Sequence, residues 1–85
     1  MSSYVSVERT RKAILANLRI IAENWENLTD RQKAAKITTL YHLAGESKSK
    51  PLYKFMLDNL YSTNKSAFDL YVTTYGLREY YVLPE

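Results

Sequence analysis

Residues 7–28, VERTRKAILANLRIIAENWENL, decide the fold class of this chain. Large apolar side chains recur here at alternating steps of three and four residues, which places them on one face of a helix. The members of this row are Val7, Ile14, Leu18, Ile21, Trp25 and Leu28. The row predicts a helix from about residue 7 to residue 26 that lies against other helices.

The flanks and the start of this row carry further signals. Ser6 is a good N-cap, because its hydroxyl can accept a hydrogen bond from a free N–H of the first turn. Leu15 and Ala22 widen the apolar stripe and are expected to face the core. Arg11 interrupts the row, and we expect its aliphatic stem to cover the end of the core while its guanidinium stays in water.

A second helix is predicted to follow Leu28. Thr29 and Gln32 have the spacing of a capping box. We expect Gly45 to end this helix as the residue just beyond its last turn. The residues expected on its inner side are Ala34, Ile37, Leu40, Tyr41 and Ala44.

Two more helices are predicted in the second half of the chain. Pro51 fits the first position of a helix, where its missing N–H needs no partner. After a break at residues 62–65, Ser66 and Asp69 resemble a capping box, and Gly76 is expected to close the helix that they open. The two inner faces are Leu52, Phe55, Met56 and Leu60, then Phe68, Tyr71, Val72 and Tyr75.

These elements predict a single all-α domain that spans residues 1–85. Its 85 residues, 46% of them hydrophobic, are enough for one core. The short connections favour a compact bundle of three to four helices. Residues 77–82 are rich in β-branched and aromatic side chains, so a short extended C-terminal segment and a final helical turn both remain open.

Composition restricts the classes of function. The chain has no cysteine, which excludes disulfides and thiolate metal sites. Its apolar runs are too short to span a membrane, and residues 1–7 lack the pattern of a signal peptide, so we expect a cytoplasmic protein. The net charge of +3 is compatible with an acidic partner without requiring one.

No pattern in the chain is typical of an enzyme. The single histidine, His42, falls in the second helix, and we expect no carboxylate near it. Glu23 and Glu26 are one helical turn apart but lack the second acidic-histidine motif of a di-metal bundle. We therefore expect no catalytic residue, no bound cofactor and no metal site.

Eight tyrosines indicate recognition of a partner, because a tyrosine ring is apolar and its tip is polar. The leading hypothesis is a small regulator or inhibitor, of a kind common among phages and mobile elements, that docks on a larger protein. The alternative is that the rings fold back and cover the bundle. Ile20, off the main row, is a candidate seam for a homodimer. The candidate protein-binding residues are Tyr53, Tyr61, Tyr71, Tyr75, Tyr80 and Tyr81.

Two basic groups support a second hypothesis, a DNA-binding or RNA-binding regulator. Lysines in a loop and at a helix start can contact phosphates, with added help from basic residues on the first helix. The loop group is Lys48, Lys50 and Lys54, and the helix group is Arg9, Lys12 and Arg19. A solubilising loop and a solvated helix face are the alternative interpretations.

One stretch resembles a known family. The order Leu28-Thr29-Asp30, a helix, residues 56–61 (MLDNLY), then Ser66 and an aromatic helix is similar to the Hha/YmoA family. Members of that family are small helical proteins that modulate nucleoid-associated DNA silencers through protein contact, so the resemblance implies a nucleoid-modulating role. The loop at 46–50, the long first helix and the tyrosine-rich tail depart from the family pattern, and no site residue is carried over.

Overall fold

The longest element is helix α1 (Ser3–Asn24). The computed structural model describes residues 3–46, 49–79 and 81–83, and only the backbone of residues 3–6. α1 begins at Ser3, so the expectation that Ser6 caps it is wrong, and Ser6 lies inside the helix. α1 is followed by the 3-10 turn η1 (Trp25–Asn27).

The apolar row of α1 is the part of the helix that enters the core. Ile14, Leu18, Ile21 and Trp25 are buried, as the spacing predicts. Leu15 is not, because 47% of its surface is exposed. Ala22 is exposed as well, so the prediction that these two residues face the core is wrong. The buried stripe is therefore narrow, since α1 has neighbours on one side only.

Arg11 extends the edge of this core. Its side chain is partly buried, and its guanidinium carbon lies 5.5 Å from the ring centroid of Phe55 on the third helix. The contact is a cation–π interaction that covers the aromatic ring. Arg11 thus lies at the edge of the core, as predicted, but its guanidinium does not stay wholly in water, because Nε is buried.

Helix α2 (Asp30–Leu40) begins at the expected capping box. The Gln32 N–H donates to Thr29 Oγ1 at 3.1 Å, and the Thr29 N–H donates to Gln32 Oε1 at 2.8 Å. Ile37 and Leu40 are buried, whereas Ala34 is exposed, contrary to expectation.

A π-helical turn, η2 (Tyr41–Gly45), continues α2. The Glu46 N–H donates to the carbonyl of Tyr41, five residues earlier, at 2.9 Å. Gly45 does not adopt the left-handed conformation expected of a helix-ending glycine. In the described part of the chain, only Gly76 has a positive φ. Gly45 is required for space: a Cβ there would overlap the Tyr41 ring and the Tyr71 hydroxyl.

Helices α3 (Lys50–Thr63) and α4 (Lys65–Tyr75) are separated by one residue, Asn64. Asn64 ends α3 and caps α4, since its Oδ1 accepts from the Ala67 N–H at 3.0 Å. The predicted capping box at Ser66 and Asp69 is therefore wrong. Gly76 closes α4 with φ 78°, as expected.

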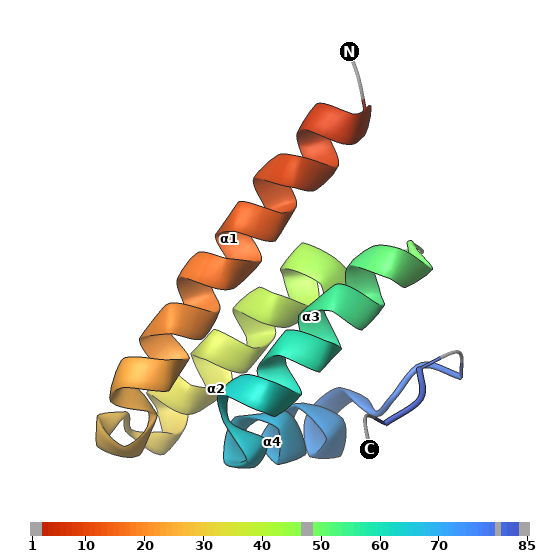
Figure 1. Ribbon diagram of the computed structural model, residues 1–85. Coiled ribbons are helices and arrows are strands. Elements are labelled where there is room, and N and C mark those ends of the chain that lie inside the picture. Colours follow the sequence, from red (N-terminus) through yellow and green to blue (C-terminus); the bar gives the residue numbers. More distant parts are fainter. Residues whose placement is uncertain (1–2, 47–48, 80, 84–85) are drawn as a thin grey trace.

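The elements form an all-α bundle, which confirms the predicted fold class. α1 packs on α2 and α3, while α4 packs on α2 and α3 and lies across one end of them (Figure 1). The first turns of α1 project beyond the other helices (Figure 1). The described residues beyond Gly76 form no strand.

Sixteen side chains, drawn from every α-helix, from η1 and η2 and from the tail, form one core. They are Ile14, Leu18, Ile21, Trp25, Ile37, Leu40, Ala44, Leu52, Tyr53, Met56, Leu57, Leu60, Ala67, Phe68, Tyr71 and Tyr81. Within the described ranges, no helix combines the length and the apolar character that crossing a membrane requires.

The close approach at Gly45 gives a first prediction. Gly45→Ala should lower the free energy of unfolding by about 1–3 kcal/mol, because the added methyl group overpacks the contact with Tyr41 and Tyr71. Urea unfolding followed by circular dichroism measures the loss. Gly76→Ala is the comparison, since its Cβ meets nothing within 4 Å and its cost, about 1–3 kcal/mol, arises from backbone conformation alone. Wild-type stability of Gly45→Ala would contradict the packing described here.

Candidate functional site

Three of the six tyrosines predicted to bind a partner lie in the core. The exposed fractions of Tyr53, Tyr71 and Tyr81 are 2%, 0% and 7%. They are buried because α4 and the tail fold over α3 and bring these rings between elements distant in sequence. The Tyr53 hydroxyl, for example, donates to the Gly76 carbonyl at 3.4 Å. These three rings cannot line an exposed surface, which corrects the prediction for them.

The other described tyrosines also contact neighbouring elements. Tyr75 stacks on Tyr41 with ring centroids 4.0 Å apart and an interplanar angle of 6°, and its hydroxyl lies 3.2 Å from Thr38 Oγ1. Tyr61 meets Phe68 edge to face at 4.9 Å. Tyr75 stays 36% exposed, and Tyr61 is partly buried. The rings of Tyr61 and Tyr75 therefore serve mainly as packing contacts between helices. Tyr80 lies outside the described residues.

Two buried phenols are held in their neutral form. Burial, with a smaller contribution from Tyr53, raises the pKa of Tyr71 well above its ordinary value. Burial likewise raises the pKa of Tyr81, and the nearby Asp58 carboxylate raises it further. Neither hydroxyl has a hydrogen-bond partner in good geometry within the described part of the chain. Both rings are present for their apolar area.

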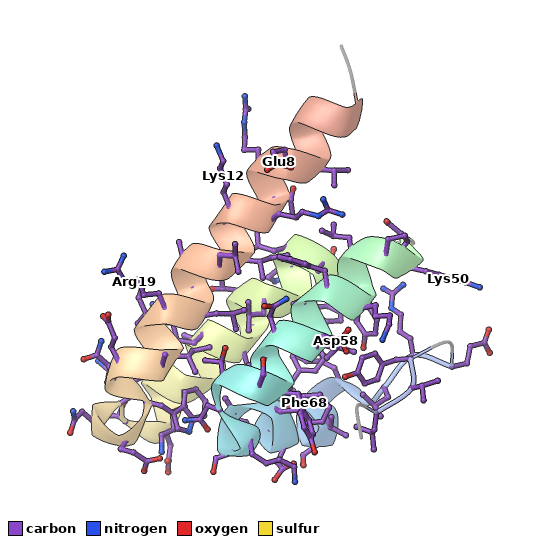
Figure 2. The ribbon with its side chains drawn as sticks, viewed as in Figure 1. Glu8, Lys12, Arg19, Lys50, Asp58 and Phe68 are labelled. Carbon is purple, nitrogen blue, oxygen red and sulfur yellow. The ribbon has the colours of Figure 1, made fainter. Side chains whose placement is uncertain are left out.

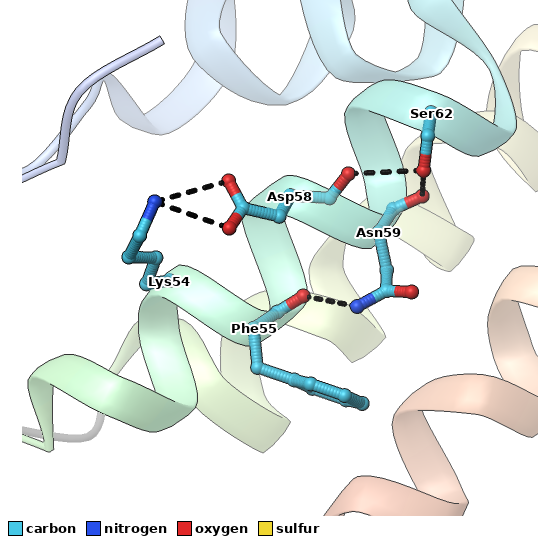
Figure 3. A network of polar contacts seen from close by, with 5 residues as sticks. All are labelled: Lys54, Phe55, Asp58, Asn59 and Ser62. Atoms are coloured by element: carbon cyan, nitrogen blue, oxygen red, sulfur yellow. Dashed lines mark hydrogen bonds and ion pairs between the residues drawn. The ribbon is translucent and has the colours of Figure 1, made fainter. Parts of the chain in front are cut away.

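Asp58 belongs to a polar network along α3 (Figure 3). Lys54 Nζ lies 3.1 Å from Asp58 Oδ2 and 5.4 Å from the centroid of the Tyr81 ring. Ser62 Oγ donates to the Asp58 carbonyl at 3.1 Å, and Asn59 donates to the carbonyl of Phe55 at 2.7 Å. Lys54 is thus engaged within the molecule.

The two basic groups do not form one surface. Figure 2 shows Lys12 and Arg19 pointing outward on the side of α1, and Lys50 pointing outward on the opposite side. Arg19 Nε also lies 3.3 Å from Glu23 Oε2, an intrahelical ion pair that accounts for part of the charge pattern of α1. Arg9 is exposed on α1. Lys48 lies outside the described residues.

His42 has a carboxylate neighbour, contrary to expectation. Its Nδ1 contacts Glu46 Oε2, four residues later in the wide turn η2, and both side chains are more than half exposed. No set of three His, Asp or Glu residues in the described ranges is grouped closely enough to hold a metal ion. The contact between His42 and Glu46 is exposed to solvent, and we assign it no binding or catalytic role.

Among the described residues, α4 and the tail form an apolar groove, here named the C-terminal groove. Its volume is about 340 Å³. Leu77 is 38% exposed and Leu83 is 50% exposed, and the neighbouring Val82 is 74% exposed. The lining residues are Tyr61, Lys65, Phe68, Asp69, Val72, Thr73, Leu77 and Leu83.

The tail can form one wall of the C-terminal groove because Tyr81 attaches it to the bundle. The Tyr81 N–H donates to the Arg78 carbonyl at 3.0 Å, and its ring centroid lies 6.3 Å from that of Phe68. Arg78 adds a cation–π contact, 4.8 Å from the ring centroid of Tyr53. Sequence reasoning identified the tail but selected its tyrosines, whereas the exposed large apolar side chains among its described residues are Leu77, Val82 and Leu83. The signal that could have indicated these leucines and the valine was their position in the sequence, on either side of the tyrosine pair.

A second groove, between α1 and α2, has a volume of about 500 Å³. Ile20, the predicted dimer seam, lines it and is 37% exposed. The remaining lining residues are Asn24, Asn27, Leu28, Gln32, Ala35 and Lys36. Four of these six residues are polar, so a larger share of this groove's lining is polar than in the C-terminal groove.

No protein-family model, curated protein or solved structure matches this chain. The resemblance to the Hha/YmoA family therefore rests only on the order of residues quoted for it. Its best-matching parts, the Leu60-Tyr61 pair and the helix that follows, lie in α3 and α4, and Leu60 is buried in the core.

The raised pKa of Tyr71 predicts a loss of stability at alkaline pH. Below pH 10 the phenol is protonated in both states, whereas above its ordinary pKa of 10.0 it ionises first in the unfolded chain. Tyr71 should therefore cost about 1.4 kcal/mol of unfolding free energy between pH 8 and pH 11. Urea unfolding of the wild type and of Tyr71→Phe at both pH values measures the difference. Equal pH dependence in the two proteins would show that the ring is accessible.

Proposed function

We propose that this protein is a small, non-enzymatic regulator or inhibitor that acts in the cytoplasm. It would bind a larger protein through the C-terminal groove. The observation that supports the proposal best is the pair of exposed leucines, Leu77 and Leu83, in the groove that α4 and the tail form. A phage or mobile-element origin remains part of the proposal, by analogy of size.

The expected partner presents an apolar segment. Each square ångström of apolar surface withdrawn from water contributes about 25 cal/mol, so covering Leu77, Val82 and Leu83 favours association. The groove has a preformed wall, α4, and a tail attached through Tyr81, which reduces the conformational entropy lost on binding. Charged Lys65 and Asp69 border the apolar part, as in many protein interfaces with a polar rim.

Nucleic-acid binding is the less favoured alternative. A nucleic-acid surface needs several cations that meet the phosphate backbone together. Here Lys12 and Arg19 point away from the bundle on one side and Lys50 on the other (Figure 2). Lys54 is paired with Asp58, and using it would require that pair to break.

Leu83→Glu tests the docking surface. A carboxylate in the groove must be desolvated against an apolar partner, so capture of the partner should fall at least about tenfold. The measurement is affinity capture with the tagged protein from lysates of its native host, with and without nuclease treatment, followed by quantitative mass spectrometry. Circular dichroism should show unchanged helix content, because Leu83 lies outside the core.

Leu15→Glu is the matched control, since Leu15 is equally exposed but lies on α1, away from the groove. This variant should retain the captured proteins. Capture that Leu83→Glu leaves intact, or that disappears with nuclease in the wild type, would contradict docking through the C-terminal groove.

A further inference from the structure

We propose that the C-terminal groove also binds a second copy of this chain. In this dimer the two α4 helices lie antiparallel about a two-fold axis, with Lys65 of each copy against Asp69 of the other. The inference does not depend on the proposed function, because self-association needs no other partner.

The two charges that carry this inference have no ion-pair partner within the described part of the molecule. Lys65 and Asp69 are both exposed and line the same groove. They are one turn apart on α4, a spacing that permits an ion pair, yet the described residues give neither of them one. Lys65 Nζ instead lies 5.7 Å from the centroid of the Tyr61 ring. Both charges are therefore available to a second molecule.

A two-fold axis would let the ion pair between Lys65 and Asp69 form twice, once in each direction. Lys65 and Asp69 lie two residues on either side of Ala67, so an axis at the level of Ala67 exchanges their positions between antiparallel helices. Each copy then supplies a cation to the other copy's anion and an anion to its cation. Such an isologous contact gains every interaction in duplicate.

The apolar lining of the groove fits the same arrangement. Tyr61 lies beyond the N-terminal end of α4, and Val72 and Leu77 lie toward its C-terminal end. Antiparallel pairing therefore brings the Tyr61 end of one copy to the Val72 and Leu77 end of the other. Leu83, half exposed in the single chain, lines this same groove and would be covered there.

The groove between α1 and α2 lacks this self-complementarity. Its lining contains one cation, Lys36, three side-chain amides and no carboxylate. A two-fold contact there would place Lys36 near its own copy without an opposite charge from the lining. A dimer through Ile20 is therefore the less favoured arrangement.

Self-association through the C-terminal groove would affect binding to a larger partner. A second copy and a larger partner would occupy the same groove, so they would compete for it. Self-association would then reduce the amount of protein free to bind a partner as its concentration rises, by mass action.

Sedimentation equilibrium of the purified full chain tests the dimer. For an interface of this limited size we expect a dissociation constant of about 10–500 µM at low salt. Lys65→Glu and Asp69→Lys each place like charges together twice, so each should weaken the dimer at least about tenfold. The double variant Lys65→Glu/Asp69→Lys restores both pairs with reversed sign and should return to within about threefold of the wild type.

Lys12→Glu is the control, because it reverses an equally exposed cation on α1 and should leave the dissociation constant unchanged. The inference is overturned by a chain that stays monomeric across the concentration range, by a dimer that neither single reversal weakens, or by a double variant that does not recover. Recovery by the double variant is specific to self-association, since a different partner would keep its original charges. Failure of the dimer would leave the Leu83→Glu capture experiment unaffected.

Discussion

The burial of Tyr81 is the constraint on which the functional surface depends. Its ring lies in the core beside Phe68, and the described residues of the tail around it, 77–79 and 82–83, form no helix or strand. A segment without such structure stays in place only if side-chain burial offsets the entropy lost on ordering it. With Tyr81 in place, Leu77 and Leu83 are held along α4 and form the C-terminal groove.

The tyrosines therefore act in a different way from the one that composition indicates. An apolar ring with a polar tip suits an interface between two proteins, but it also suits the junction between two helices of one protein. Tyr53 and Tyr75 illustrate the second use, since their rings pack between elements while their hydroxyls bond to Gly76 and Thr38. The aliphatic side chains Leu77, Val82 and Leu83 of the tail stay exposed and contribute much of the exposed apolar surface of the described residues.

Features that depend on residues close in sequence could be predicted well, whereas features that depend on packing between distant elements could not. The capping box at Thr29, the buried row of α1 and the closure at Gly76 follow from hydrogen bonding and periodicity within a few residues. The π turn η2 and the close approach of Gly45 to Tyr71 could not be predicted, because both arise where η2 meets α4. For the same reason the tail was recognised as a candidate site, while the residues that line the groove were not.

The mobility of the tail tests the central claim most directly. Backbone ¹⁵N relaxation of the wild type gives order parameters for Val82 and Leu83, the two described residues after Tyr81. If Tyr81 attaches the tail, these values should be about 0.8, close to those of α4, and should fall below about 0.6 in Tyr81→Ala while α4 keeps its own. Values below about 0.6 in the wild type would show that the tail is free, and would contradict a groove formed by α4 and the tail.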